Sequence, residues 1–237
     1  MRRFPLCLSA AALIIGFIAT PASAQQQSVN FYVGGFTPRG FDSRGTDDVL
    51  FQNANFLTFD VKDFNGATVG AEWLVGMTDL FDAGIGLGFY QRTTPSVYTR
   101  RTFEDQSEIE QDLKLRIVPF TATIRFLPLG HHGPVQPYIG GGVAVMRWRY
   151  SETGEFVDLT DDSIFRGNFV GTGTATGPVI LGGVTFPIGA VGIGGEIRYQ
   201  SARGDLPTNQ GFATNGVDNP KIDLGGMNYL FMISVRF

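Results

Sequence analysis

The chain ends in residues 228–237, NYLFMISVRF, where one residue in every two is apolar without exception. That parity consists of Tyr229, Phe231, Ile233, Val235 and Phe237. A period of two predicts a β-strand, because successive side chains of a strand point to opposite faces. Soluble domains usually end in a frayed polar tail. An aromatic last residue therefore predicts that the end of this chain is built into a sheet.

The same alternation recurs along the chain, and the connections between the alternating segments are short and long by turns. The predicted strands are residues 28–38, 67–77, 81–92, 113–126, 137–150, 179–186, 191–200 and 222–237. Residues 78–80, 127–136 and 187–190 are short connections, whereas 40–66, 93–112, 151–177 and 201–221 run to about 20 residues or more. Short turns at one end and long loops at the other are typical of a transmembrane β-barrel.

Composition favours the same fold. Charged residues make up 17% of the chain, against about 25% in ordinary soluble domains. Residues 167–195 carry no charge and are long enough for a membrane helix, but they include ten glycines and two prolines. Lipid offers no hydrogen bonds, so a sheet can cross it only as a closed ring. We therefore predict an all-β fold, an eight-stranded antiparallel up-and-down transmembrane β-barrel.

The first 24 residues predict an export signal. Arg2 and Arg3 precede an apolar run, and Ala22-Ser23-Ala24 has the small-x-small pattern of a cleavage site. An uncleaved anchor is the alternative. We expect residues 1–24 to be a signal peptide and 25–237 the barrel domain. Removing the signal leaves 16 Lys and Arg against 22 Asp and Glu, a net charge of −6, and it also removes Cys7, the only cysteine. Without a basic stripe, nucleic acid is not an expected partner.

Three stretches carry a resemblance to a known family. The alternating C-terminal strand with its terminal Phe237, the stretch GEIRYQ (195–200), and LRIVPFTATIRFLPLG (115–130) followed by PYIGGGVAV (137–145) resemble the small bacterial outer-membrane β-barrels. That group includes the OmpA, OmpX and OmpW types. The resemblance implies localisation in the bacterial outer membrane, both termini in the periplasm, and contact with outer-membrane lipid. It also implies that the barrel-assembly machinery reads the C-terminal signal, namely Tyr229, Phe231, Ile233, Val235 and Phe237.

A secreted lipocalin-like barrel is the soluble alternative. Its outer face meets water and should be rich in Lys and Glu. Here the second face of the predicted strands is mainly Gly, Thr and Ser, which suits a narrow, crowded lumen.

Charged residues on that second face form the main candidate site. The predicted lumen charge network consists of Glu72, Arg125, Arg147, Glu196 and Arg198. These side chains either line a small pore or pair across a filled interior, since an unpaired buried charge is costly. For residues 137–150 we expect Tyr138, Ala144, Met146, Trp148 and Tyr150 to face outward and Arg147 and Arg149 to face inward. Tyr138, Trp148, Tyr150, Tyr199 and Tyr229 suit the aromatic girdles at the membrane interfaces, with ordinary packing as the alternative.

Nothing in the sequence predicts catalysis. The only histidines, His131 and His132, fall in a short connection on the expected periplasmic side, where we expect them to be solvated. No histidine is then available near the outer rim or the outer wall for a Ser-His or Asp-His catalytic set. Acidic clusters in the long connections lack the spacing of a calcium loop. We expect no enzyme activity, no cofactor and no metal. The expected function is either a narrow passive conduit, with small hydrophobic molecules as the candidate ligands, or that of a structural envelope protein. A surface adhesion or interaction protein, whose long loops meet an external partner, is the alternative.

Overall fold

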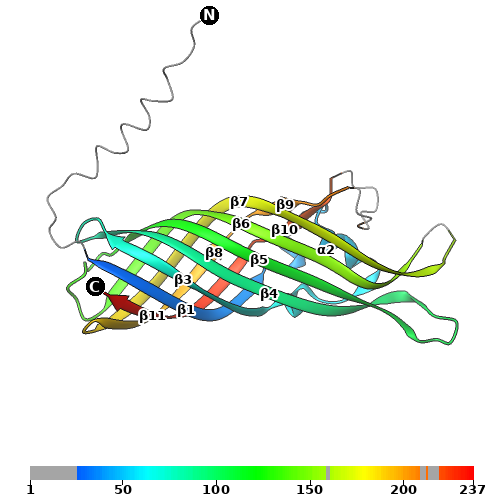
Figure 1. The fold of residues 1–237 in the computed structure, drawn as a ribbon, viewed down its shortest axis with the longest axis horizontal. Coiled ribbons are helices and arrows are strands. Elements are labelled where there is room, and N and C mark those ends of the chain that lie inside the picture. Colours follow the sequence, from blue (N-terminus) through cyan, green and yellow to red (C-terminus); the bar gives the residue numbers. More distant parts are fainter. Residues whose placement is uncertain (1–25, 159–160, 209–211, 213–218) are drawn as a thin grey trace, which may run out of the picture.

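Figure 1 shows the computed structural model of the chain, which describes residues 26–158, 161–208, 212 and 219–237. Within these ranges eight antiparallel strands close into a ring in the order β1, β3, β4, β5, β6, β7, β8, β11 and back to β1. The predicted eight-stranded barrel is therefore confirmed. The strands are β1 (Gln27–Pro38), β3 (Gly66–Gly76), β4 (Phe81–Thr102), β5 (Glu108–Phe126), β6 (Gln136–Val157), β7 (Ile164–Ile188), β8 (Val191–Gln200) and β11 (Gly226–Arg236). The predicted signal peptide, with Cys7, lies outside the described residues.

The ring closes between the first and last strands, as the C-terminal pattern predicts. β1 and β11 pair without interruption from Ser28 opposite Arg236 to Pro38 opposite Gly226. Beyond them, the Phe237 N–H donates to the Gln27 carbonyl at 3.0 Å, and the Gln27 N–H donates to the Phe237 carbonyl at 3.3 Å. The last residue is thus part of the wall. Its end of the barrel is also the one with the short turns (Figure 1).

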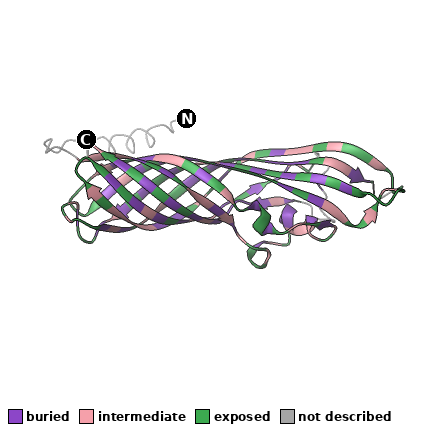
Figure 2. Cartoon of the chain, turned by 90° about the horizontal axis from the view of Figure 1, so that it is seen from below, coloured by how far each residue is buried: buried purple, intermediate pink, exposed green. Residues whose placement is uncertain are grey.

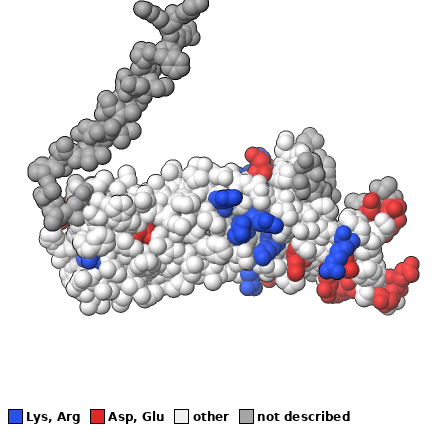
Figure 3. All heavy atoms as spheres, in the orientation of Figure 1, with Lys and Arg blue, Asp and Glu red and all other residues white. Residues whose placement is uncertain are grey.

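An uncharged apolar band surrounds the end of the barrel that carries the short turns. The outward positions of the band are almost all apolar or glycine, and most of the large side chains are exposed. On β5 it covers Val118–Phe126, nine residues, which matches the about 9–11 residues that a strand needs to cross a bilayer. Figure 3 shows this part of the surface almost free of Lys, Arg, Asp and Glu. Lipid is the solvent in which such a surface is stable.

Four strands continue well beyond this band. β4, β5, β6 and β7 extend as two long hairpins (Figures 1 and 2). The prediction of long loops at 93–112 and 151–177 is therefore wrong. Only residues 103–107 separate β4 from β5, and only 158–163 separate β6 from β7. The predicted strand 179–186 is likewise the end of the 25-residue β7. Charged residues, and glycines in 167–177, interrupt the alternation there, so the sequence pattern predicts loops.

β5 shows how one strand serves two environments. In the band its outward residues are apolar, such as Phe120 and Ile124, and its inward ones are polar, such as Arg125. Beyond the band the pattern inverts, because Lys114 is exposed whereas Leu115 is buried. The pleat is unchanged, but the outside is now water and the inside is an apolar core.

The inner face of these extensions is covered by segments from the other connections. They are η1 (Phe41–Ser43), α2 (Val49–Asn53), β2 (Leu57–Thr58), η2 (Val61–Phe64), β9 (Arg203–Asp205) and β10 (Lys221–Asp223). The predicted strand 222–237 is thus two separate pieces, β10 and β11. Asp48 caps α2 by accepting from the Leu50 and Phe51 N–H groups, and it also accepts from the Asp223 N–H at 2.6 Å. The Asp48 carboxylate thus links α2 to β10. The covering segments and the two outer hairpins together are called the cap unit.

The apolar residues of the cap unit form a continuous core above the lumen. It includes Leu50, Phe64, Leu113, Leu115, Tyr150 and Ile222, each at most 1% exposed. Among the described residues, no helix is long and apolar enough to cross a membrane.

The apolar band predicts a depth-dependent cost of charge. Ile85 lies at the middle of the outward row of β4 and is 58% exposed. Ile85→Arg should lower the free energy of unfolding by about 2–4 kcal/mol, because lipid cannot solvate the guanidinium. The measurement is guanidinium unfolding in phospholipid vesicles, followed by tryptophan fluorescence.

Thr102→Arg is the matched control, since Thr102 is exposed at the far end of β4. It should change stability by less than about 0.5 kcal/mol. Equal effects of the two substitutions would show that water, and not lipid, surrounds the band.

Candidate functional site: the closed lumen

Two acids and two bases meet in the middle of the lumen. Glu72 comes from β3, Arg125 from β5, and Glu196 and Arg198 from β8. β4 separates β5 from β3, and β6 and β7 separate β5 from β8, so Arg125 reaches through the lumen to both carboxylates. Four of the five residues of the predicted charge network are thus brought together, and we call them the charge cluster.

Each arginine of the charge cluster contacts both glutamates. Arg125 Nη2 donates to Glu72 Oε2 and, at 2.9 Å, to Glu196 Oε2. Arg198 Nε donates to Glu196 Oε1 at 2.7 Å, and its Nη2 lies 3.2 Å from Glu72 Oε2. Two positive and two negative charges alternate around a closed circuit, so the cluster has no net charge.

Neighbouring side chains satisfy the remaining acceptors and cover the guanidinium faces. Thr123 Oγ1 donates to Glu72 Oε1, and the Tyr138 hydroxyl donates to Glu196 Oε2, both at 2.9 Å. Tyr138 also lies under the Arg125 guanidinium, with its ring centroid 4.5 Å away. Such charge-assisted bonds give geometric specificity, and the cation–π contact adds to it.

Glycines on β4 make room for these long side chains. In the part of β4 nearest the short turns, the inward residues include Gly84, Gly86 and Gly88. A Cβ at Gly84 would lie 2.9 Å from both Glu72 Oε1 and Thr123 Oγ1, and one at Gly86 would lie 2.7 Å from Thr121 Oγ1. Glycine at alternate positions of residues 84–88 therefore leaves the space that the side chains of the charge cluster occupy.

The charge cluster fills the lumen at its level. Its four side chains are between 0 and 4% exposed, so within the part of the chain that the structure describes water does not reach them. Below the cluster, a cavity of about 30 Å³ at the end with the short turns is lined by Arg125, Asp82, His131 and Arg236, among others. A cavity of this size holds only one or two waters.

Arg147 does not belong to the charge cluster, and the register predicted for residues 137–150 is wrong. Arg147 and Arg149 are exposed on the outer face, and the residues predicted to face outward are buried inside: Tyr138, Ala144, Met146, Trp148 and Tyr150. Gly140–Gly142 gave no parity signal. The strand leaves the band after Val145, so Met146, Trp148 and Tyr150 face the core of the cap unit. Of the predicted girdle aromatics, Tyr229 faces outward at 52% exposure and Tyr199 is half-buried.

The predicted assembly signal lies on the outer surface of β11. Tyr229, Phe231, Ile233 and Val235 are 40–52% exposed, and Phe237 is 71% exposed. Their side chains point away from the lumen, where lipid or another protein can reach them.

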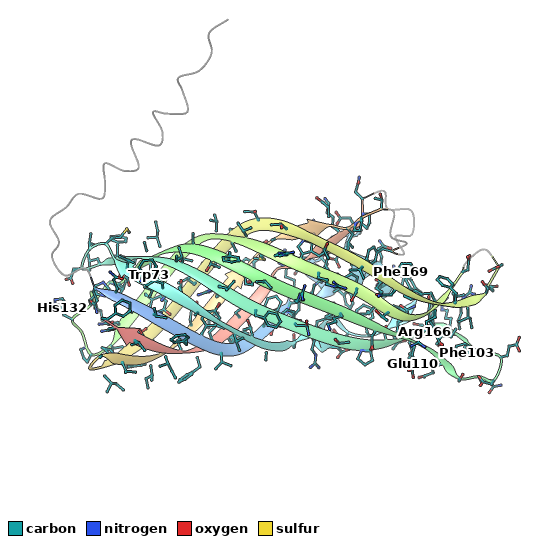
Figure 4. All side chains as sticks on the ribbon, viewed as in Figure 1. Trp73, Phe103, Glu110, His132, Arg166 and Phe169 are labelled. Atoms are coloured by element: carbon teal, nitrogen blue, oxygen red, sulfur yellow. The ribbon has the colours of Figure 1, made fainter. Side chains whose placement is uncertain are left out.

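The histidines occupy two different environments. His132 is exposed at the end with the short turns (Figure 4). The prediction of a solvated side chain is wrong for His131, which is 9% exposed with Nε2 at 3.1 Å from Asp82 Oδ1. Across the described ranges, no three His, Cys, Asp or Glu side chains gather as a possible metal site.

A second buried polar group, in the cap unit, was missed by the sequence analysis. Glu152 Oε1 accepts from Asn53 Nδ2 of α2 at 2.6 Å and from the Tyr150 hydroxyl at 2.8 Å. Burial raises the pKa of the Glu152 carboxyl above its ordinary value, and the two donors oppose that rise without reversing it. The bond from Asn53 fastens α2 to β6. The side chain of Glu152 has no basic partner among the described residues.

Comparison with known proteins supports the fold. No protein-family model and no curated protein sequence matches the chain. Among solved structures, the outer membrane protein OprG from Pseudomonas aeruginosa matches with a TM-score of 0.55 at 11% identity, over 90% of this chain and 96% of OprG. This chain has the fold of the small outer-membrane β-barrels. The resemblance noted in the sequence is thereby confirmed for the fold.

Two further structures align over similar lengths. Neisserial surface protein A matches with a TM-score of 0.47 at 13% identity, over 90% of this chain and 97% of that protein. The Escherichia coli outer membrane protein W matches with a TM-score of 0.40 at 15% identity, over 89% and 97%.

Removing one member of the charge cluster should be costly. Arg125→Met leaves two buried carboxylates with a single cation and should lower the free energy of unfolding by about 3–5 kcal/mol. Guanidinium unfolding in vesicles provides the measurement. Arg100→Gln, at an exposed position of the outer β4 extension, is the control and should be nearly neutral. A loss of under about 1 kcal/mol for Arg125→Met would mean that water already reaches the carboxylates.

Glu152 should make the cap unit less stable as pH rises. A carboxyl whose pKa is raised on folding binds its proton more tightly in the folded state, so stability falls as pH rises from the unfolded pKa through the folded one. Glu152→Gln keeps the acceptor and removes the titration. We expect this variant to lose that pH dependence and to equal or exceed the wild type in stability at pH 8.

The measurement is amide hydrogen exchange of α2 and the outer part of β6 between pH 5 and pH 8, corrected for intrinsic exchange. Asp105→Asn, in the exposed turn after β4, is the control and should leave the slope unchanged. An unaltered slope in Glu152→Gln would contradict the assignment.

Proposed function

We propose that this chain is a non-enzymatic bacterial outer-membrane protein whose closed barrel anchors the cap unit outside the cell. The apolar band supports the membrane location, because a continuous uncharged ring of exposed Phe, Ile, Leu and Val is stable only in lipid. As in barrels of this type, the short turns and both chain ends then face the periplasm.

The closed lumen is the observation that carries the structural role. The charge cluster fills the barrel, and the packed core of the cap unit lies above it. The charge cluster and the core of the cap unit both obstruct the lumen. The surface available to other molecules outside the cell is then the outer surface of the cap unit. Figure 4 places Phe103, Glu110 and Arg166 at that far end. We propose that this surface meets an external partner.

A planar bilayer experiment tests the closed lumen. Purified, folded wild-type protein should leave the bilayer sealed. Glu72→Ala/Arg125→Ala removes one acid and one base, keeps the lumen neutral, and should introduce discrete conductance steps. Steady conductance by the wild type at moderate voltage would overturn the closed-barrel role.

A conduit for small apolar molecules is the second candidate, and one feature of the wall favours it. The pairing of β4 with β5 is interrupted at Gly88 and Phe89, which lie level with Pro119 and Val118. Pro119 has no N–H to donate, so this part of the wall has one backbone donor fewer. This gap lies on the cap side of the charge cluster, so a molecule leaving sideways into lipid would not need to pass the cluster.

Transport into vesicles separates the two candidates. Uptake of an apolar fluorophore above the protein-free rate, lost in Pro119→Val, would favour the conduit. Equal rates with wild type, Pro119→Val and empty vesicles would favour the closed anchor.

A further inference from the structure

Four cations lie together where the apolar band ends. They are Lys114 and Arg116 of β5 and Arg147 and Arg149 of β6, all exposed on the outer face. The outward residue below Arg116 is Val118, and the one below Arg147 is Val145, so the cations form the first row beyond lipid-facing side chains. Figure 3 shows Lys and Arg gathered at this border. We call these four residues the basic row.

The register places like charges side by side. Arg116 lies directly opposite Arg149, an arrangement that is destabilising in a sheet unless another group compensates it. The partners on the flanking strands are uncharged: Thr93 and Gln91 on β4, and Thr172 and Thr174 on β7. Within the described residues, none of the four cations forms an ion pair.

Acids are present nearby, but only further from the band. On β5 the next outward residues are Asp112 and Glu110, both exposed. Strand geometry separates Asp112 from Lys114 by about 7 Å along the chain. Along β5 the outer face therefore runs from apolar to basic to acidic with distance from the band, and this order matches a bilayer whose phosphates lie just above its hydrocarbon.

Arginine suits this role because its planar guanidinium donates two parallel hydrogen bonds to a phosphate. The threonine hydroxyls on β7 add donors at the same level. Asp112 and Glu110 repel an anion that approaches from solution, whereas an anion held in the bilayer lies beneath them. A lipid phosphate is thus favoured over a free one.

We propose that the basic row is a binding site for a phosphorylated lipid of the outer leaflet, with Arg116 and Arg149 gripping its phosphate and the apolar residues below contacting its acyl chains. This inference rests on the membrane location proposed above. A shallow apolar groove of about 510 Å³ on the outer face of the band is lined in part by Leu87, Phe120 and Val145. Val145, at its edge, is the outward neighbour of Arg147 on β6.

The probe is bis-phosphorylated lipid A added to wild-type protein in phosphatidylcholine nanodiscs. Binding is measured by native mass spectrometry at about 0.1 M salt. Arg116→Gln/Arg149→Gln should bind at least about tenfold more weakly, since two charge-assisted contacts are lost. Arg100→Gln, an exposed cation of β4 outside the basic row, should bind as the wild type does.

Dephosphorylated lipid A and inorganic phosphate test whether the basic row recognises a phosphate that belongs to a lipid. Dephosphorylated lipid A should bind as weakly to the wild type as intact lipid A does to the double variant. Equal binding of both lipids, or displacement of lipid A by millimolar inorganic phosphate, would overturn the proposal. Protein that never enters the nanodiscs would instead contradict the membrane location itself, so the two failures are distinguishable.

Discussion

The backbone's need for hydrogen bonds governs this molecule. In hydrocarbon an unpaired N–H or C=O costs several kcal/mol, so the wall has to close on itself. The pairing of Phe237 with Gln27 meets that need at the seam, and the unbroken β1–β11 register continues it. With closure, each strand gains one face toward lipid and one toward a narrow interior. The band, the charge cluster and the inward glycines of β4 all follow from that division.

The interior shows how a narrow barrel accommodates charge. Eight strands leave space for side chains but little for water, so each buried charge needs its partners within the wall. Glu72, Arg125, Glu196 and Arg198 supply them as a neutral circuit. The cluster belongs to three strands that are distant in sequence, so it also fastens β5 to β3 and β8 across the lumen. A buried ion pair of this kind specifies geometry more than it adds stability.

The sequence predicts the ring well because alternation is a local property. The faces of β4 and β11 can be read from a few residues, and the structure agrees with them. Alternation tells which residues share a face but not which solvent that face meets. The alternation therefore predicts outward positions for Trp148 and Tyr150, although they lie in the core of the cap unit. Contacts such as Asn53 with Glu152, or His131 with Asp82, join segments whose distance apart depends on the whole ring, and no local pattern encodes that.

The inversion of polarity along β5 has a consequence for how the molecule sits in its membrane. Between Ile117 and Val118 the apolar face of β5 changes from the inner to the outer side of the barrel. Sliding the protein deeper would immerse Arg116 in hydrocarbon, and raising it would wet Phe120. Both displacements raise the free energy, so this change of polarity along β5 determines how deep the barrel lies in the bilayer. It fixes the vertical position of the barrel, and therefore the height at which the cap unit is held above the bilayer.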